Sequence, residues 1–176
     1  MAREGCMNSK WIITAVVALL VAHGGFGQPR ALPHQIRTYL DSTYYGWKFS
    51  TVAQDMRDAF FSAPDKDPSF IRGDFNHDGK WDYAVQITCD DSSKSRRVVI
   101  AFLATKSGFK PFVVESMRED NEYYITLDPR SAERFDFSAN KRFVNPSDGI
   151  SIGYAGRGGY TYFFRRGAFY RVDTAD

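Results

Sequence analysis

Residues 83–104, YAVQITCDDSSKSRRVVIAFLA, determine the fold because two strand patterns follow one another here. In residues 83–89 apolar side chains, ending at Cys89, alternate with smaller or polar ones, which is the period of a half-buried strand. Residues 90–94 (DDSSK) are polar and predict a turn. Residues 98–104 (VVIAFLA) are apolar at every position, as in a strand covered on both faces. The stretch therefore predicts an antiparallel strand pair in the core of the protein.

The residues before this pair have a helical period. Ile36, Tyr39, Leu40 and Tyr44 are spaced as one face of a helix that begins near Pro33. Residues 51–54 (TVAQ) have the pattern of a capping box and predict a second short helix. This segment therefore predicts two helices before the sheet.

Further strand patterns follow the central pair. They are expected at residues 109–114, 123–127, 150–154, 160–164 and 168–172, with Arg166-Gly167 as the last hairpin turn. Two helices followed by consecutive strands predict an α+β fold, in which N-terminal helices pack on a mainly antiparallel β-sheet meander.

Composition and charge exclude some classes of protein. The chain has 176 residues, 16% of them aromatic, with 23 basic and 21 acidic side chains and a net charge of +2. A charge this close to zero lacks the strongly basic footprint of a nucleic-acid-binding protein, so no nucleic-acid partner is expected. The aromatic content favours strands.

The N-terminal residues have the pattern of a secretory signal peptide. Arg3 and Lys10 precede the apolar run 11–22 (WIITAVVALLVA), and Gly25 and Gly27 form a small-x-small cleavage site. The run is shorter than the roughly 20 residues of a membrane-spanning helix, although an uncleaved anchor is the alternative. We expect a signal peptide at 1–27, a single domain at 28–176, and a secreted or periplasmic protein without stable membrane insertion.

One short motif carries a chemical prediction. Residues 73–85, GDFNHDGKWDYAV, place acidic and amide side chains at positions 1, 3, 5 and 9 of a loop, with Gly79 at position 6. This is the spacing of an EF-hand-type calcium loop, in which position 7 contributes a backbone carbonyl. The predicted Ca²⁺ ligands are the side chains of Asp74, Asn76, Asp78 and Asp82 and the carbonyl of Lys80.

The loop departs from the EF-hand at its last position. Position 12 is Val85, where the helix–loop–helix site has a bidentate Glu. The loop is therefore expected to join two strands, and its affinity is expected to be weak, with a Kd of about 10⁻⁴ to 10⁻³ M. The alternative is a metal-free Asp/Asn-rich turn held by side-chain-to-backbone hydrogen bonds.

The motif resembles the G-D-x-N-x-D-G-x-x-D core of FG-GAP and VCBS-type repeats. That resemblance implies that Asp74, Asn76, Asp78 and Asp82 are side-chain ligands of calcium and that Lys80 is the carbonyl ligand. A single copy cannot form a propeller, which needs at least four blades. The whole chain is similar to small secreted bacterial proteins of uncharacterised function with one such loop, a resemblance that implies no activity.

Three functions are compatible with these patterns. The first is an exported non-enzymatic protein with one structural calcium site, and the second is a secreted hydrolase in which the metal only stabilises the scaffold. The third is a module that binds a carbohydrate or protein through the alternating aromatic residues Tyr160, Tyr162 and Phe164. His34 and His77 have no triad-like partners in the sequence, so no catalytic residue is assigned and an enzyme is the less favoured reading.

Overall fold

The computed structural model describes residues 32–61, 67–91, 94–118, 123–154 and 158–174. The predicted signal peptide, residues 1–27, lies outside the described residues, so export remains a prediction. Within the described residues there are two helices and eleven strands, and every strand pair is antiparallel.

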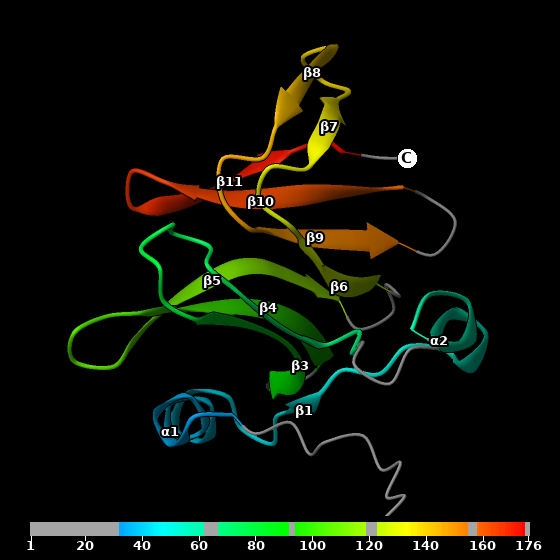
Figure 1. The fold of residues 1–176 in the computed structure, drawn as a ribbon. Coiled ribbons are helices and arrows are strands. Elements are labelled where there is room, and N and C mark those ends of the chain that lie inside the picture. Colours follow the sequence, from blue (N-terminus) through cyan, green and yellow to red (C-terminus); the bar gives the residue numbers. More distant parts are fainter. Residues whose placement is uncertain (1–31, 62–66, 92–93, 119–122, 155–157, 175–176) are drawn as a thin grey trace, which may run out of the picture.

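Most strands belong to two sheets (Figure 1). The first sheet contains β1 (Lys48–Phe49), β2 (Phe70–Gly73), β3 (Asp82–Asp91), β4 (Lys94–Ala104) and β5 (Phe109–Arg118). The second sheet contains β6 (Tyr123–Asp128), β9 (Gly149–Tyr154), β10 (Gly159–Arg165) and β11 (Ala168–Val172). A separate hairpin contains β7 (Glu133–Asp136) and β8 (Lys141–Val144). The helices are α1 (His34–Thr43) and α2 (Gln54–Phe60).

The order of strands places β3 and β4 inside the first sheet. The order is β1-β3-β4-β5, and β2 shares the free side of β3 with β1. In the second sheet the order is β11-β10-β9-β6. The two sheets are also joined directly, because the Ile125 N–H donates to the Pro68 carbonyl at 2.9 Å and Gln86 Nε2 donates to the Tyr123 carbonyl at 2.9 Å.

The predicted α+β class is wrong, and the fold is β-rich. The helices α1 and α2 have only 10 and 7 residues, whereas β3, β4 and β5 have 10, 11 and 10. The main core lies between two sheets, so sheet-on-sheet packing dominates and the helices are additions to it. Figure 1 shows the second sheet above the first, with α1 below and β7–β8 above.

The core between the sheets is built from one face of each. It contains Ile71, Phe75, Ala84, Val99, Ala101 and Leu103 from the first sheet and its loop, and Tyr123, Ile125, Ile150, Ile152 and Tyr162 from the second. Each buried aliphatic or aromatic side chain contributes about 1.5–3 kcal/mol of transfer free energy. This core holds the two sheets together.

The outer face of the first sheet is covered by α1. Ile36 and Leu40 are fully buried against a cluster that includes Val85, Ile87 and Cys89. Helical spacing thus predicted the buried face of α1 correctly, and Cys89 is the core thiol that its strand pattern predicted. The strand 98–104 is covered on both faces, as predicted.

The strand β3 is more deeply buried than its sequence predicted. Ala84, Gln86 and Thr88, expected on a solvent face, are 0%, 0% and 4% exposed because the second sheet covers them. Their polar groups are satisfied in part: Gln86 Nε2 reaches the Tyr123 carbonyl and Thr88 Oγ1 lies 3.0 Å from Ser50 Oγ. Alternation in the sequence distinguished the two faces of β3, but it could not show that both of them are covered.

The helix termini differ from prediction in one respect. The helix α2 begins at Gln54 after Ala53, which forms no side-chain capping hydrogen bond, so the predicted capping box at Thr51 is wrong.

The expected hairpin at Arg166-Gly167 is confirmed, with φ of 52° and 88° between β10 and β11. Two positive φ angles match the right-handed twist of paired strands.

The alternating aromatic residues of β10 face inward. Tyr162 belongs to the core between the sheets, and Tyr160 and Phe164 pack against it. On the other face of β10, Phe163 is fully buried beneath the β7–β8 hairpin, where its ring lies 5.9 Å from that of Phe143. These rings therefore stabilise the fold and do not form an exposed aromatic surface.

Candidate metal-binding loop

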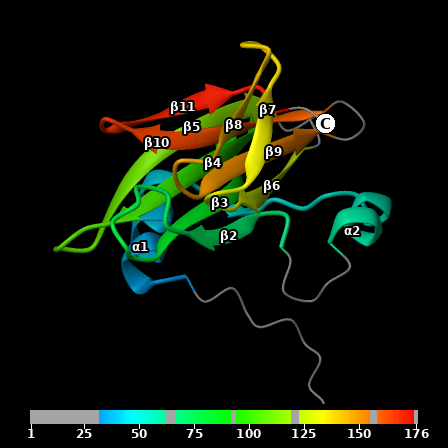
Figure 2. The ribbon, with the colours of Figure 1, turned by 45° about the horizontal axis from the view of Figure 1, so that its top comes forward.

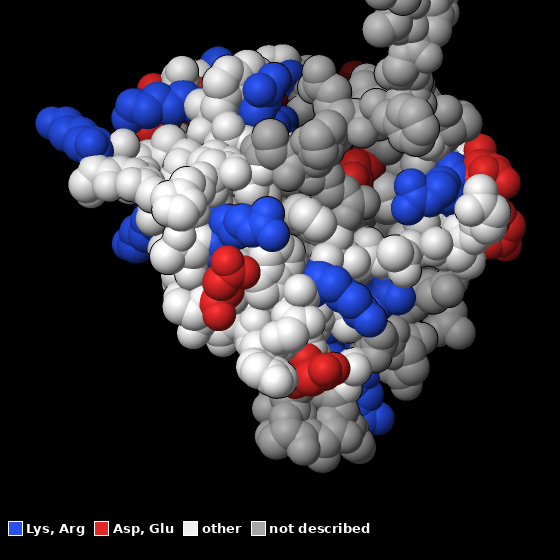
Figure 3. All heavy atoms as spheres, turned by 90° about the horizontal axis from the view of Figure 1, so that it is seen from below, with Lys and Arg blue, Asp and Glu red and all other residues white. Residues whose placement is uncertain are grey.

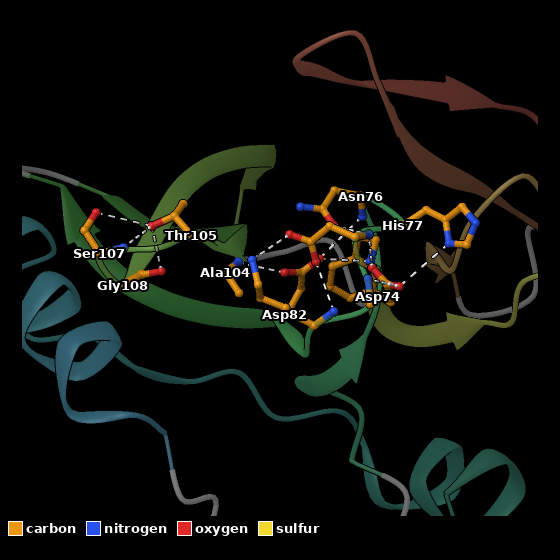
Figure 4. A network of polar contacts seen from close by, with 12 residues as sticks. Asp74, Asn76, His77, Asp82, Ala104, Thr105, Ser107 and Gly108 are labelled. Atoms are coloured by element: carbon orange, nitrogen blue, oxygen red, sulfur yellow. Dashed lines mark hydrogen bonds and ion pairs between the residues drawn. The ribbon is translucent and has the colours of Figure 1, made fainter.

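The predicted calcium loop connects β2 to β3. Gly73 and Asp82 are paired across the two strands, and the intervening residues form the turn, so the expectation that the loop joins strands is confirmed. His77 and Gly79 have φ of 60° and 80°, which curl the chain tightly between the strands. Figure 4 shows Asp74, Asn76 and Asp82 around this turn.

Two of the predicted ligand side chains, those of Asp74 and Asn76, are held together by a shared backbone donor. The Asp78 N–H donates to Asp74 Oδ1 at 2.9 Å and to Asn76 Oδ1 at 3.1 Å. The Gly79 N–H donates to Asp74 Oδ2 at 2.9 Å. Because one N–H binds both oxygens, Asp74 and Asn76 present their side chains to the same side of the loop.

Lys80 provides a positive charge inside the motif. Its backbone N–H donates to Asp78 Oδ1 at 3.0 Å, and its ammonium group lies 3.3 Å from Asp78 Oδ2. Desolvation acts to raise the pKa of Asp78, but the Lys80 hydrogen bonds outweigh it and the pKa lies below its ordinary value. Asp78 is therefore an anionic carboxylate at neutral pH.

Asp82 has a different environment from the other three side chains. Its residue is 0% exposed, Oδ2 accepts from the N–H groups of Phe75 at 2.9 Å and Asn76 at 3.4 Å, and Oδ1 accepts from Ala104 at 2.7 Å. Burial raises the pKa of Asp82 to about 6, against the opposing effect of the three N–H donors. Asp82 thus ties the loop to the end of β4 (Figure 4).

Two residues that the sequence did not single out also position the loop. Phe75, at position 2, is fully buried in the core between the sheets. Asp148 accepts the Asp74 N–H at Oδ2 and the Arg130 N–H at Oδ1, both at 2.8 Å. A Cβ at Gly73 would lie 2.7 Å from the Leu127 side chain and 3.0 Å from that of Asp148, so a larger residue there would require these side chains to shift. The burial of Phe75 could have been predicted from its apolar side chain. The contact of Asp148 with the loop could not, because no local sequence pattern indicates it.

The histidine of the loop lies at its surface. His77 has 47% of its side-chain surface exposed, and its Nδ1 is 3.8 Å from Asp74 Oδ2. His34 is the first residue of α1 and is exposed. The two histidines are therefore on separate elements, and the structure does not bring them into one site.

The loop presents oxygen ligands suited to a hard cation when the amide of Asn76 is counted with the carboxylates. Among the described residues there is no group of three or more His, Cys, Asp and Glu side chains arranged to hold a metal ion. The loop instead combines the carboxylates of Asp74 and Asp78 with the amide of Asn76, all of them oxygen donors, as calcium prefers. Each carboxylate or amide oxygen has two lone pairs, so one N–H bond leaves capacity for a cation.

The face seen from below has basic and acidic side chains interspersed (Figure 3). None of the described helices is sufficiently long and apolar to span a bilayer. Comparisons with protein-family models, curated proteins and solved structures gave no match to this chain.

Proposed function

We propose that this chain is an exported, non-enzymatic protein in which the β2–β3 loop binds one structural calcium ion. The proposed ligands are the side chains of Asp74, Asn76 and Asp78 and the carbonyl of Lys80, as in the FG-GAP and VCBS-type loops that the motif resembles. Asp82, at position 9, accepts hydrogen bonds from the loop backbone and from Ala104. We propose it as the fifth and weakest calcium ligand.

The convergence of Asp74 and Asn76 on the Asp78 N–H carries this proposal. It places two hard oxygen donors, together with the Asp78 carboxylate, on one short turn. Like charges at about 4 Å cost about 1 kcal/mol per pair even in bulk water, so a divalent cation would relieve the repulsion between Asp74 and Asp78. The Lys80 ammonium relieves part of it already.

A structural role fits the loop better than a catalytic one. The loop is fixed to β3, to the end of β4 through Asp82, and to Asp148. A catalytic metal needs an open position beside a base. The nearby histidine, His77, is exposed, and its Nδ1 lies 3.8 Å from Oδ2 of the proposed ligand Asp74.

Calcium is expected to stabilise the folded protein. A ligand that binds only the folded state adds RT ln(1 + [L]/Kd), or about 1.4 kcal/mol at calcium tenfold above Kd. For a domain of this size that corresponds to a rise of about 4 °C in Tm. Thermal unfolding followed by circular dichroism, with calcium titrated at constant ionic strength, measures the rise.

Two variants separate calcium binding from the stability of the turn. Asp78→Ala should remove the calcium-dependent rise, whereas Asp58→Ala, an exposed carboxylate of α2, should keep it. Asp78→Asn retains an oxygen acceptor for the Lys80 N–H and should show a smaller rise. An unchanged melting curve for the well-folded wild type in calcium would show that the loop is a metal-free turn.

Export is tested separately from metal binding. The signal-peptide pattern at residues 1–27 predicts that protein recovered from outside the cytoplasm begins at Gln28. Intact-mass spectrometry of the native protein determines the first residue. Recovery of the uncleaved chain from the membrane fraction would instead support the anchor alternative.

A further inference from the structure

A second polar cluster lies inside the sandwich, away from the calcium-type loop. We call it the inter-sheet polar cluster; it consists of Arg97 from β4, Glu115 and Met117 from β5, Tyr123 from β6, Tyr154 from β9, and Tyr160 and Tyr162 from β10. Arg97 is 8% exposed and Tyr123 is 0% exposed. Such a concentration of buried polar groups requires internal partners.

The tyrosines of β9 and β10 already have partners. Tyr162 donates its hydroxyl to Glu115 Oε2 at 2.6 Å, and Tyr160 approaches the same oxygen at 3.4 Å. The hydroxyls of Tyr154 and Tyr160 are 2.5 Å apart, and that of Tyr154 also contacts Met117 Sδ at 2.9 Å. Oε2 of Glu115 thus accepts from the tyrosine hydroxyls, and its Oε1 accepts from the Ser116 N–H at 3.0 Å.

Two nitrogens of Arg97 and the hydroxyl of Tyr123 differ from these tyrosines in having no hydrogen-bond partner. The Nε and Nη1 atoms of Arg97 and the hydroxyl of Tyr123 are buried, and none has a hydrogen-bond partner. The guanidinium carbon lies 5.9 Å from the centre of the Tyr123 ring. No described carboxylate forms an ion pair with Arg97. A buried guanidinium left in this state is costly, since a charge removed from water must be paired.

The unsatisfied groups specify the chemistry of a missing partner. Both Arg97 atoms are obligate donors. Burial raises the pKa of Tyr123, with the Arg97 charge opposing this only in part, so the hydroxyl keeps its proton at neutral pH. Two donors on a positively charged guanidinium, with a third on the neighbouring tyrosine, favour an acceptor that is negatively charged, because charge-assisted hydrogen bonds are the stronger ones. The position between two packed sheets requires that it be small.

We propose that Arg97 and Tyr123 bind a small monovalent anion, of the size of a halide, between the two sheets. Tyr154 and Tyr160 are only half-buried, so the cluster reaches towards the surface at this end of the sandwich. The site is separate from the proposed calcium site and does not depend on it. The anion completes the electrostatics of the core and stabilises the native state by binding to it alone.

Bromide is a suitable probe because it is a halide with a strong anomalous X-ray signal. Tm of the wild type is expected to rise saturably as bromide replaces the much larger gluconate at constant ionic strength. Arg97→Met should weaken the bromide response by more than about tenfold, because charged hydrogen bonds are lost. Tyr123→Phe, which removes only the hydroxyl, should weaken it by about fivefold.

A neighbouring arginine provides the control. Arg96→Met changes an exposed side chain next to Arg97 on β4 and should leave the bromide response unchanged. An equal bromide response in wild type and Arg97→Met would overturn the proposal. Crystals of the wild type grown in bromide give a test that is independent of variant folding: an anomalous peak within hydrogen-bond distance of Arg97 supports the site, and water alone there overturns it.

Discussion

Replacing Phe75 with Ala is expected to lower the free energy of unfolding by about 4 kcal/mol, near the middle of the range for buried Phe→Ala changes. The Phe75 side chain is fully buried in the core between the sheets although it belongs to a turn. Its loss leaves a cavity beside Gly73, where the backbone and the Phe75 ring approach closely. Urea unfolding at equilibrium, with calcium removed, measures the change.

Phe137 supplies the matched control. Its side chain is 55% exposed and packs mainly on Phe135, with 4.9 Å between ring centres. Phe137→Ala should therefore cost less than about 1 kcal/mol, as most surface substitutions do. If both variants lost the same stability, Phe75 would not be the anchor of the loop in the core.

Replacing Asp82 with Ala is expected to lower the free energy of unfolding by about 3 kcal/mol, because the buried N–H of Phe75 and the partly buried N–H groups of Asn76 and Ala104 would lose their acceptor. The loss should be present in calcium-free buffer. Chemical denaturation of the metal-free protein measures it directly.

Asp78→Ala is the comparison that separates the buried, structural Asp82 from the exposed Asp78 of the proposed calcium site. In calcium-free buffer it should cost about 1 kcal/mol, since Asp78 is exposed and its oxygens accept from the N–H and the ammonium group of Lys80, which is itself exposed. In calcium the two variants should differ less, because Asp78→Ala loses more of the ligand stabilisation than Asp82→Ala, whose side chain is the weaker proposed ligand. An Asp82→Ala protein as stable as the wild type without calcium would contradict the structural assignment of Asp82.

Local patterns predicted the elements of the fold better than their arrangement. Strands at residues 123–127 and 168–172 follow their sequence periods closely. The short strands β1 and β2 were missed because two to four residues are too few for a period. The class was wrong because helices came first in the sequence, and order alone does not show that two sheets bury the larger core between them.

In the candidate loop, too, the local pattern was predicted better than the contacts with distant residues. Its spacing predicted that Asp74, Asn76 and Asp78 share a turn between strands, and the backbone hydrogen bonds at Asp78 agree with this. Its spacing could not show that Asp82 would face Ala104, because that partner is 22 residues away. Arg97 lies between the predicted turn at 90–94 and the apolar run 98–104, and the sequence patterns predict nothing for it; it is buried because the second sheet covers it.

The hydrogen bond between Asp74 and Asp148 has a consequence for kinetics. These residues are 74 apart in the sequence, so the contact closes a long segment of chain, and such contacts form slowly because closure costs entropy before any contact compensates for it. Interactions that are absent from the folding transition state change the rate of unfolding more than the rate of folding. We therefore expect the β2–β3 loop, with its proposed ion, to form late in folding and to slow the unfolding of the native protein.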